Sequence, residues 1–219
     1  IGRWGSYLLG ALIPMAIIPF VPLSLALIFQ IIAILLILDT FQICDKKDQL
    51  IVGAVGLSFS GMAFIYNFTH ETYKIGFGLF CIALSLYIYT REIKGRYFLA
   101  LIPAVFAISI YQPFLPALVT VYLLYVIYTW NKSNVMRLKE IGKIIIFTVL
   151  SFVIYYLISK LFVALFGVTE YGYLTKAFDF DFVGNNPGLL IKNFLWQIFN
   201  VYSGGEAIYG VEIRSLAII

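Results

Sequence analysis

The sequence predicts an all-α membrane protein: a polytopic bundle of transmembrane helices with an external interfacial amphipathic helix. The chain is 62% hydrophobic and 12% charged, with a mean hydropathy of +0.97, whereas soluble domains carry about 25% charged residues. Its apolar stretches run unbroken for roughly 16–23 residues, while the strands of a membrane barrel alternate over about 10. Because lipid allows only helices or closed barrels to span it, these run lengths favour helices.

The apolar runs predict one membrane domain over residues 1–219. We expect a fragment of a longer protein, because the chain starts without Met and stops inside an apolar run. A short bent piece at 6–20 comes first, since Pro14 and Pro19 break or kink a helix. Spans are expected at about 21–38, 50–66, 75–90, 98–110, 114–130 and 144–166, and a last one starts near 209.

The polar break Tyr111-Gln112-Pro113 divides the apolar run 98–130. That run is too long for one crossing at ~1.5 Å per residue against a hydrocarbon core of ~30 Å. Pro113 and Pro116 mark the place where the chain turns. We therefore expect two spans joined by a tight hairpin.

An amphipathic helix is expected at 188–203. Asn186-Pro187 resembles a helix start, with Asn as the cap and Pro at the first helical position. Asn193, Gln197 and Asn200 recur at helical spacing opposite apolar residues. Such a helix lies on a membrane rather than across it.

Charge orients the chain. Alternating crossings put the loops at 39–49, 91–97 and 131–143 on one side, and these loops hold nine of the 15 Lys and Arg residues. Basic loops stay in the cytoplasm, so 67–74, the hairpin and 167–209 are expected on the outer side. The basic residues are scattered between hydrophobic spans, and nucleic acid is not an expected partner.

Tyr111 and Gln112 are the sharpest candidates for a binding site on the outer side. A glutamine amide can both donate to and accept from sugar hydroxyls, and a tyrosine can stack on a sugar face. The alternative is that the tyrosine belongs to the interfacial aromatic belt and the glutamine only ends a turn. Residue spacing alone favours this second interpretation.

Two pairs of titratable residues on the outer side are further candidates. His70 and Glu71 offer a proton-transfer pair near neutral pH, although a solvated loop pair is the commoner outcome for adjacent residues. Asp179 and Asp181 alternate with phenylalanines, which puts both carboxylates on one face of an extended segment. They could bind a divalent cation or a polar acceptor, but two acids without further ligands equally describe an exposed acidic edge.

Two basic residues also stand near the outer boundary. Arg3, in Gly2-Arg3-Trp4-Gly5, can pair with a phosphate through its bidentate fork, or can serve with Trp4 as an interfacial anchor. Lys160 lies within the span 144–166, only about a turn and a half from its outer end. A charge within a span suggests function, whereas extension of the side chain to headgroup phosphates is the simpler explanation.

A family resemblance joins these residues. Gly2-Arg3-Trp4 followed by a proline-broken apolar segment, Ile110-Tyr111-Gln112-Pro113-Phe114, and the short outer loop with Asn67-Phe68 and Glu71 resemble the type II glucosyl transferase family. That family comprises integral membrane enzymes that modify bacterial O-antigen. The resemblance spans most of the chain through short motifs.

The resemblance implies a polytopic glycosyltransferase of the GT-C class in the bacterial cytoplasmic (inner) membrane. Such an enzyme moves a sugar, here glucosyl, from a polyprenyl-phosphate donor to an extracytoplasmic cell-surface glycan. Arg3 would contact the donor phosphate, Tyr111 and Gln112 the sugar or lipid phosphate, and His70 and Glu71 would line the pocket. The class carries its catalytic acid in the first large external loop, so we expect the base upstream of this chain. A divalent cation is a candidate cofactor.

Two rival functions share this profile. A transporter or flippase of lipid-linked sugars would carry ionisable groups or broken helices near the bilayer midplane, where this sequence is mostly apolar. A non-enzymatic membrane scaffold would need none of the outer polar side chains for glycan modification. The clustering of polar groups at the outer boundary favours an interfacial enzyme.

Overall fold

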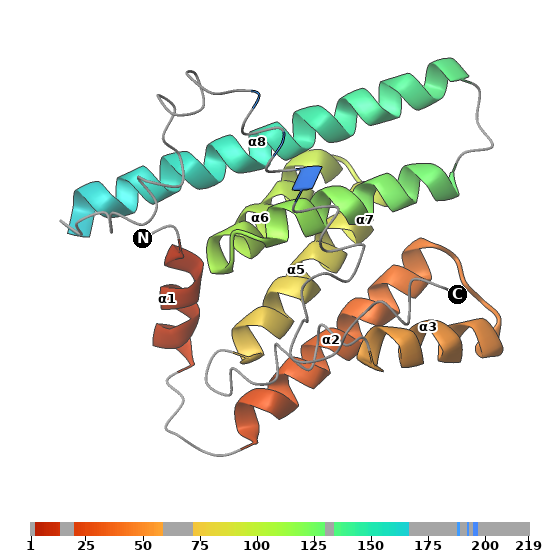
Figure 1. Cartoon of the computed structure of the whole chain (residues 1–219), viewed down its shortest axis with the longest axis horizontal. Helices are drawn as coiled ribbons and strands as arrows, with labels where there is room; N and C mark the ends of the chain where they lie inside the picture. The colour runs from red at the N-terminus through yellow and green to blue at the C-terminus, as the bar shows by residue number, and fades with distance from the viewer. Residues whose placement is uncertain are drawn as a thin grey trace. The chain divides into compact units, whose positions relative to one another are not determined.

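The structure, a computed structural model, describes residues 3–13, 20–58, 72–129 and 134–166, together with Gly188, Lys192, Leu195 and Trp196; at 134–137 it describes the backbone alone. The chain divides into two compact units, Ile1–Val168 and Thr169–Ile219. The labelled helices of Figure 1 all belong to the first unit, and no strand occurs among the described residues. The all-α fold class is thereby confirmed. These helices are α1 (Trp4–Leu12), α2 (Val21–Thr40), α3 (Lys46–Ser58), α5 (Thr72–Thr90), α6 (Arg96–Ile110), α7 (Phe114–Tyr128) and α8 (Asn134–Phe166).

The protein is a membrane protein by the composition and length of its helices. Three helical segments are long and apolar enough to cross a bilayer: Val21–Thr40, Thr72–Thr90 and Leu138–Phe166. Helices α6 and α7 are apolar but shorter, at 15 residues each. Many outward-facing side chains on α2 and α8 are aliphatic, with Leu35 58% exposed and Ile146 68% exposed. Exposure of such apolar faces to water is unfavourable, whereas contact with lipid tails is favourable.

Proline and glycine set several helix boundaries. Phe20 has a φ of 71° at the start of α2, and Pro22 occupies its first turn, where no backbone donor is needed. Gly95 has a φ of 77° at the start of α6, a conformation that costs glycine little. Pro113 precedes α7 with a φ of −58°, so the hairpin expected at Tyr111-Gln112-Pro113 joins α6 to α7.

The start of α8 differs from expectation. The segment 131–143 reads as a basic loop, yet the helix begins at Asn134 and continues for 33 residues. At ~1.5 Å per residue it is about 50 Å long, well beyond a hydrocarbon core of ~30 Å. The first turns extend the span with polar residues, because lysine, arginine and glutamate are good helix formers that hydropathy alone marks as loop.

The core is built around α5, which packs between α2 and α6. Glycines permit the closest contacts: a Cβ built on Gly76 would lie 2.7 Å from the Cα of Ala26, and one on Gly78 would lie 2.1 Å from the ring of Phe114. Small residues allow membrane helices this proximity. The main buried cluster then joins α5, α6, α7 and α8 through Leu86, Ala104, Leu118, Tyr122 and Phe147.

Several polar groups inside the bundle have hydrogen-bond partners. Ser85 Oγ donates to the carbonyl oxygen of Ala100 at 2.8 Å and lies 2.8 Å from the hydroxyl of Tyr122. Since Ser85 has one proton to donate, Tyr122 donates to Ser85. Gln30 Nε2 donates to the carbonyl oxygen of Gly56 at 2.9 Å and so links α2 to α3. An unsatisfied polar group in lipid is costly, which explains these pairings.

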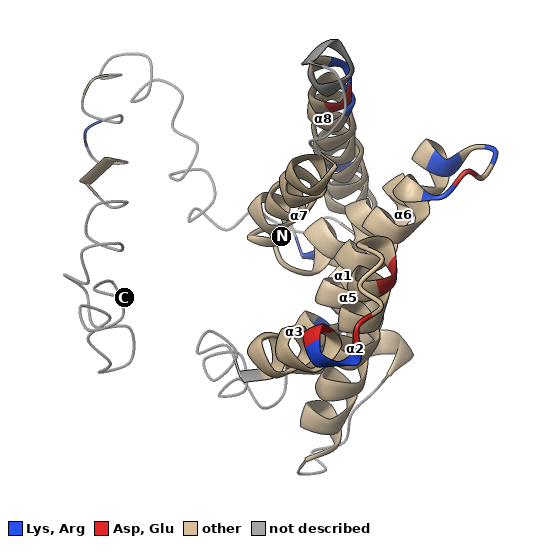
Figure 2. Cartoon of the chain, turned by 90° about the vertical axis from the view of Figure 1, so that its right-hand side faces the viewer, with Lys and Arg blue, Asp and Glu red and all other residues tan. Residues whose placement is uncertain are grey.

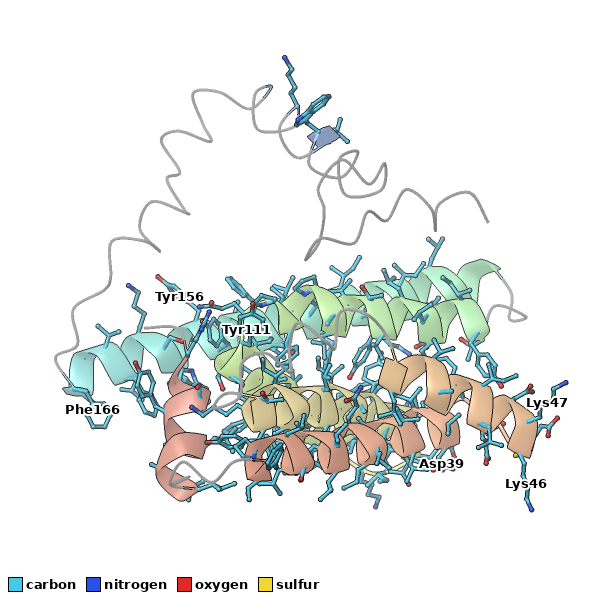
Figure 3. The ribbon with its side chains drawn as sticks, turned by 60° about the horizontal axis from the view of Figure 1, so that its bottom comes forward. Asp39, Lys46, Lys47, Tyr111, Tyr156 and Phe166 are labelled. Atoms are coloured by element: carbon cyan, nitrogen blue, oxygen red, sulfur yellow. The ribbon has the colours of Figure 1, made fainter. Side chains whose placement is uncertain are left out.

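The basic segments meet at one end of the unit, which we call the basic end: the α2–α3 connection, the α5–α6 connection and the start of α8. Arg91 forms an ion pair with Asp39 across the first two, and Lys143 Nζ lies 2.6 Å from Glu140 on α8. Figure 2 looks onto this end and shows the charged residues of the three segments in separate groups. The opposite end holds the α6–α7 turn and α1, and Figure 3 shows Tyr111 far from Lys46 and Lys47. We call it the hairpin end.

Candidate functional site

Arg3 stands at the start of α1 and contacts the hairpin. Its side chain is exposed, and its guanidinium carbon lies 5.0 Å from the centre of the Tyr111 ring. Its backbone carbonyl accepts hydrogen bonds from the amides of Ser6 and Tyr7, at 3.0 and 3.3 Å, which fixes the residue to the first turn. A guanidinium placed over an aromatic ring can still donate N–H groups to a phosphate or carboxylate. The structure thus brings together two residues that are 108 positions apart in the sequence.

Trp4 holds α1 in place. Its indole ring stacks on Phe162 of α8, with centroids 5.4 Å apart and planes at 14°, and meets the edge of Phe106 on α6 at 5.9 Å. The ring is 9% exposed, so burial of its large apolar surface contributes strongly to the position of the helix. Because Trp4 is held in place, the backbone of the adjacent residue Arg3 is held in place as well.

Gly5 brings α1 against α6. A Cβ at Gly5 would lie 2.0 Å from Ser109 Oγ and 3.2 Å from the backbone nitrogen of Ile110. A larger residue there would require the Ser109 side chain to move or the two helices to shift. Figure 1 shows α1 running across the direction of α6 and α8 rather than along it. The expected bent, interfacial piece at 6–20 is thus represented by a nine-residue helix whose last residue, Leu12, precedes Pro14.

The hairpin is a tight backbone turn. Tyr111 is extended, with φ −152° and ψ 116°, and its carbonyl oxygen accepts a hydrogen bond from the amide of Phe114 at 2.9 Å. The carbonyl of Gln112 accepts one from Leu115 at 2.9 Å. The Tyr111 ring meets the edge of the Phe114 ring at 5.8 Å, which orients the phenol beneath Arg3.

Gln112 is held by α8. Its Nε2 donates a hydrogen bond to the hydroxyl oxygen of Tyr155 at 3.2 Å. Tyr155 is 6% exposed and belongs to a second buried cluster with Trp4, Val105 and Ile108. Through Trp4 the cluster adjoins Arg3, and through Tyr155 it adjoins Gln112, so one apolar cluster supports the candidate phosphate contact and the candidate sugar contact.

Other cations lie at the hairpin end as well. Lys74 Nζ lies 5.8 Å from the Tyr73 ring and 3.6 Å from the position of a Cβ on Gly10. Lys160 Nζ lies 5.6 Å from the ring of its exposed neighbour Tyr156. Among the described residues every acidic side chain lies in or beside the segments of the basic end. These are Asp39, Asp45, Asp48, Glu92 and Glu140.

Four candidate site residues fall outside the described part of the chain: His70, Glu71, Asp179 and Asp181. Most of the helix expected at 188–203 and the span expected from 209 fall outside it too. Within the described residues, no group of three or more His, Cys, Asp or Glu side chains could hold a metal ion. The roles of these residues stay predictions.

Tyr155 is the contributor that sequence reasoning missed. It lies in the middle of an apolar span beside a second tyrosine, where nothing in the pattern separates it from residues facing lipid. The available signal is the seven-residue spacing of Tyr155 and Phe162, which puts both on one face of a helix. That spacing becomes informative once Trp4 and Gln112 are known to meet this face.

Comparison with known proteins adds one finding. A family model described as Glucosyl transferase GtrII matches residues 1–216, nearly the whole chain. No curated protein and no solved structure matches it. The matched region includes Arg3, the hairpin and Tyr155.

Proposed function

Since the chain belongs to the glucosyl transferase GtrII family, we propose that it transfers a glucosyl group from a polyprenyl-phosphate donor to a cell-surface glycan. The reaction takes place on the outer side of the bacterial cytoplasmic membrane. The single observation that carries the donor assignment is the Arg3 guanidinium lying over the ring of Tyr111, the neighbour of Gln112. This arrangement offers a cation for a phosphate and an amide for a sugar at the same end of the bundle.

The physical state of such a donor fits the position of these groups. A prenyl tail stays in the hydrocarbon, so the phosphate and sugar emerge where the bundle meets water. The hairpin end is the end away from most of the described Lys and Arg residues. Basic segments remain in the cytoplasm, which supports an extracytoplasmic location for Arg3, Tyr111 and Gln112.

The chemistry divides between binding and proton transfer. The bond between the anomeric carbon and the phosphate oxygen breaks, a bond from that carbon to an acceptor hydroxyl oxygen forms, and the hydroxyl proton passes to a base. Arg3 stabilises the charge that develops on the departing phosphate, because preorganised cations act most strongly where charge accumulates. We assign the base to an acidic residue upstream of Ile1, with His70 and Glu71 lining the pocket. Asp179 and Asp181 are candidates for acceptor or divalent-cation binding.

Substitution of Arg3 tests the assignment. In membranes that contain the full-length protein, Arg3→Ala should lower glucosyl transfer from polyprenyl-phosphate glucose to the cell-surface glycan about a hundredfold. Arg3→Lys should keep part of the activity, because lysine keeps the charge but loses the bidentate fork. Lys46→Ala, an exposed residue at the basic end, is the matched charge control and should transfer at the wild-type rate.

The outcomes separate the rival functions. Loss of transfer at normal protein level excludes a scaffold. Wild-type transfer by Arg3→Ala would remove Arg3 from the donor site and contradict the proposal. A transporter would move the lipid-linked sugar across the membrane without forming the glycosidic bond, so a product covalently attached to the acceptor also excludes it.

A further inference from the structure

We infer that Tyr155 is a positioning residue that orients Gln112 so that the amide carbonyl oxygen, rather than the amino group, faces a hydroxyl of the transferred sugar. This inference rests on the proposed function and identifies which part of the donor Gln112 recognises. The observation behind it is the hydrogen bond of 3.2 Å from Gln112 Nε2 to the Tyr155 hydroxyl.

The two ends of a glutamine amide recognise different groups. A glutamine side chain ends in one donating amino group and one accepting carbonyl oxygen, and their order around the terminal carbon decides what it recognises. Tyr155 occupies the amino side of Gln112. Within the described part of the chain no residue donates to Oε1 of Gln112, and the side chain is only half buried. The accepting oxygen is therefore the group left for a ligand.

The phosphate and the sugar of the donor differ in the hydrogen bonds that they can form. The phosphate of the donor carries oxygens that accept and do not donate when it is ionised. A carbonyl oxygen repels such a group and attracts a hydroxyl. Arg3 presents only donors, and its guanidinium lies over the Tyr111 ring. Arg3 accordingly binds the phosphate of the donor, and Gln112 binds a hydroxyl of its sugar.

Tyr155 is held in a fixed position. Its ring is buried with Trp4, Val105 and Ile108 in the cluster beneath the site. A buried aromatic ring on a long helix keeps its hydroxyl in one place. Tyr156, the next residue on α8, is 50% exposed and lies beside Lys160 instead. Figure 3 shows Tyr111 and Tyr156 at the same end of the unit, which makes Tyr156 a suitable matched control.

The experiment compares sugar donors within each variant, so that protein level cancels. The full-length enzyme in membranes is given short-chain polyprenyl-phosphate glucose, its monodeoxy analogues and the corresponding deoxyfluoro analogues. Wild type should discriminate against one monodeoxy analogue about tenfold by kcat/KM. The deoxyfluoro analogue at the same position has a fluorine that can accept a hydrogen bond but cannot donate one. Wild type should use it as poorly as it uses the monodeoxy analogue.

Tyr155→Phe should lose most of that discrimination and raise KM more than it lowers kcat, because the amide can then rotate. Tyr156→Phe should keep the wild-type ranking. In a Gln112→Ala background Tyr155→Phe should have no further effect on the ranking, since residues that act through one group are not additive. Purely structural damage would lower the rates for every donor together and leave the ranking unchanged.

Three results overturn the inference: Tyr155→Phe ranks the donors as wild type does, its effect persists in Gln112→Ala, or the deoxyfluoro donor recovers activity. Recovery would mean that Gln112 donates its amino group to the sugar. If wild type uses none of these donors, the proposed function itself is wrong and the inference falls with it. If wild type uses them and only the Tyr155 effects are missing, the proposed function stands.

Discussion

The backbone of Gly76 on α5 touches the backbone of Ala26 on α2: a Cβ on Gly76 would lie 2.7 Å from both the Cα and the carbonyl oxygen of Ala26. Backbone atoms cannot move aside as a flexible side chain can. Gly76→Ala should therefore force α2 and α5 apart and destabilise the protein by about 1–3 kcal/mol. Thermal unfolding of the purified protein in detergent measures this.

Gly53 provides the comparison for that substitution. It also lies in a helix, but a Cβ there meets nothing within 4 Å. Gly53→Ala should leave the unfolding temperature unchanged or raise it slightly, because alanine is the better helix former. Equal effects of the two substitutions would contradict the close approach of α2 and α5.

Gly5 makes a related prediction for activity. Gly5→Ala puts a methyl group within 2.0 Å of Ser109 Oγ, and the resulting shift of α1 carries Arg3 with it. Transfer should fall about ten- to a hundredfold, the scale of a misplacement of about 1 Å. The double variant Gly5→Ala/Ser109→Ala removes the clashing oxygen and should recover part of the rate. A double variant as poor as the single one would mean that α1 is not positioned by this contact.

The hydrogen bonds of Ser85 predict an asymmetry in stability. Tyr122→Phe leaves Ser85 bonded to Ala100, so its cost should be about 0.5–1 kcal/mol. Ser85→Ala instead leaves the buried Tyr122 hydroxyl without its partner, which should cost about 1–3 kcal/mol. Denaturant unfolding in mixed micelles distinguishes the two. A larger cost for Tyr122→Phe would mean that packing of the ring hydroxyl outweighs satisfaction of the hydrogen bond.

The sidedness of the bundle is open to a labelling experiment. Cys44 is exposed at the basic end and Cys81 is buried in α5. With the basic end in the cytoplasm, a membrane-impermeant thiol reagent should label Cys44 only after the cells are permeabilised. A cysteine at the exposed position Pro113, in a Cys44→Ser background, should be labelled in intact cells. The reverse pattern would move Arg3, Tyr111 and Gln112 to the cytoplasm and contradict the proposed function.

Hydropathy and proline positions predict much of this fold. The hairpin at Tyr111-Gln112-Pro113 follows from a length argument and from the fixed φ of proline, both of which are local. The all-α class likewise follows from composition. The boundary at Asn134 could not be predicted in this way, because the first turns of α8 contain good helix formers of low hydropathy, among them Arg137, Lys139 and Glu140.

Which helix faces meet is harder to predict from the sequence. Helices α2, α7 and α8 are apolar around their whole circumference, so no polar stripe marks the outward side. Among the described spans the closest glycine contacts are at Gly76 and Gly78 in α5, whereas a Cβ on Gly53 in α3 would meet nothing within 4 Å, and hydropathy alone does not distinguish these glycines. The partnership of Gln112 and Tyr155 has the same origin. It depends on how α8 is rotated against the hairpin, and this rotation is a property of packing rather than of any local pattern.

The two residues of α8 beneath the site have a geometric consequence. Phe162 supports Trp4, the neighbour of Arg3, and Tyr155 supports Gln112. Seven residues along a helix span about 10 Å, and a continuous helix hardly changes that length when it tilts or slides. A movement of α8 would therefore carry both contacts in the same direction. The separation between the group proposed to meet the donor phosphate and the group proposed to meet a sugar hydroxyl would be preserved, and a donor of fixed length would remain in register with both.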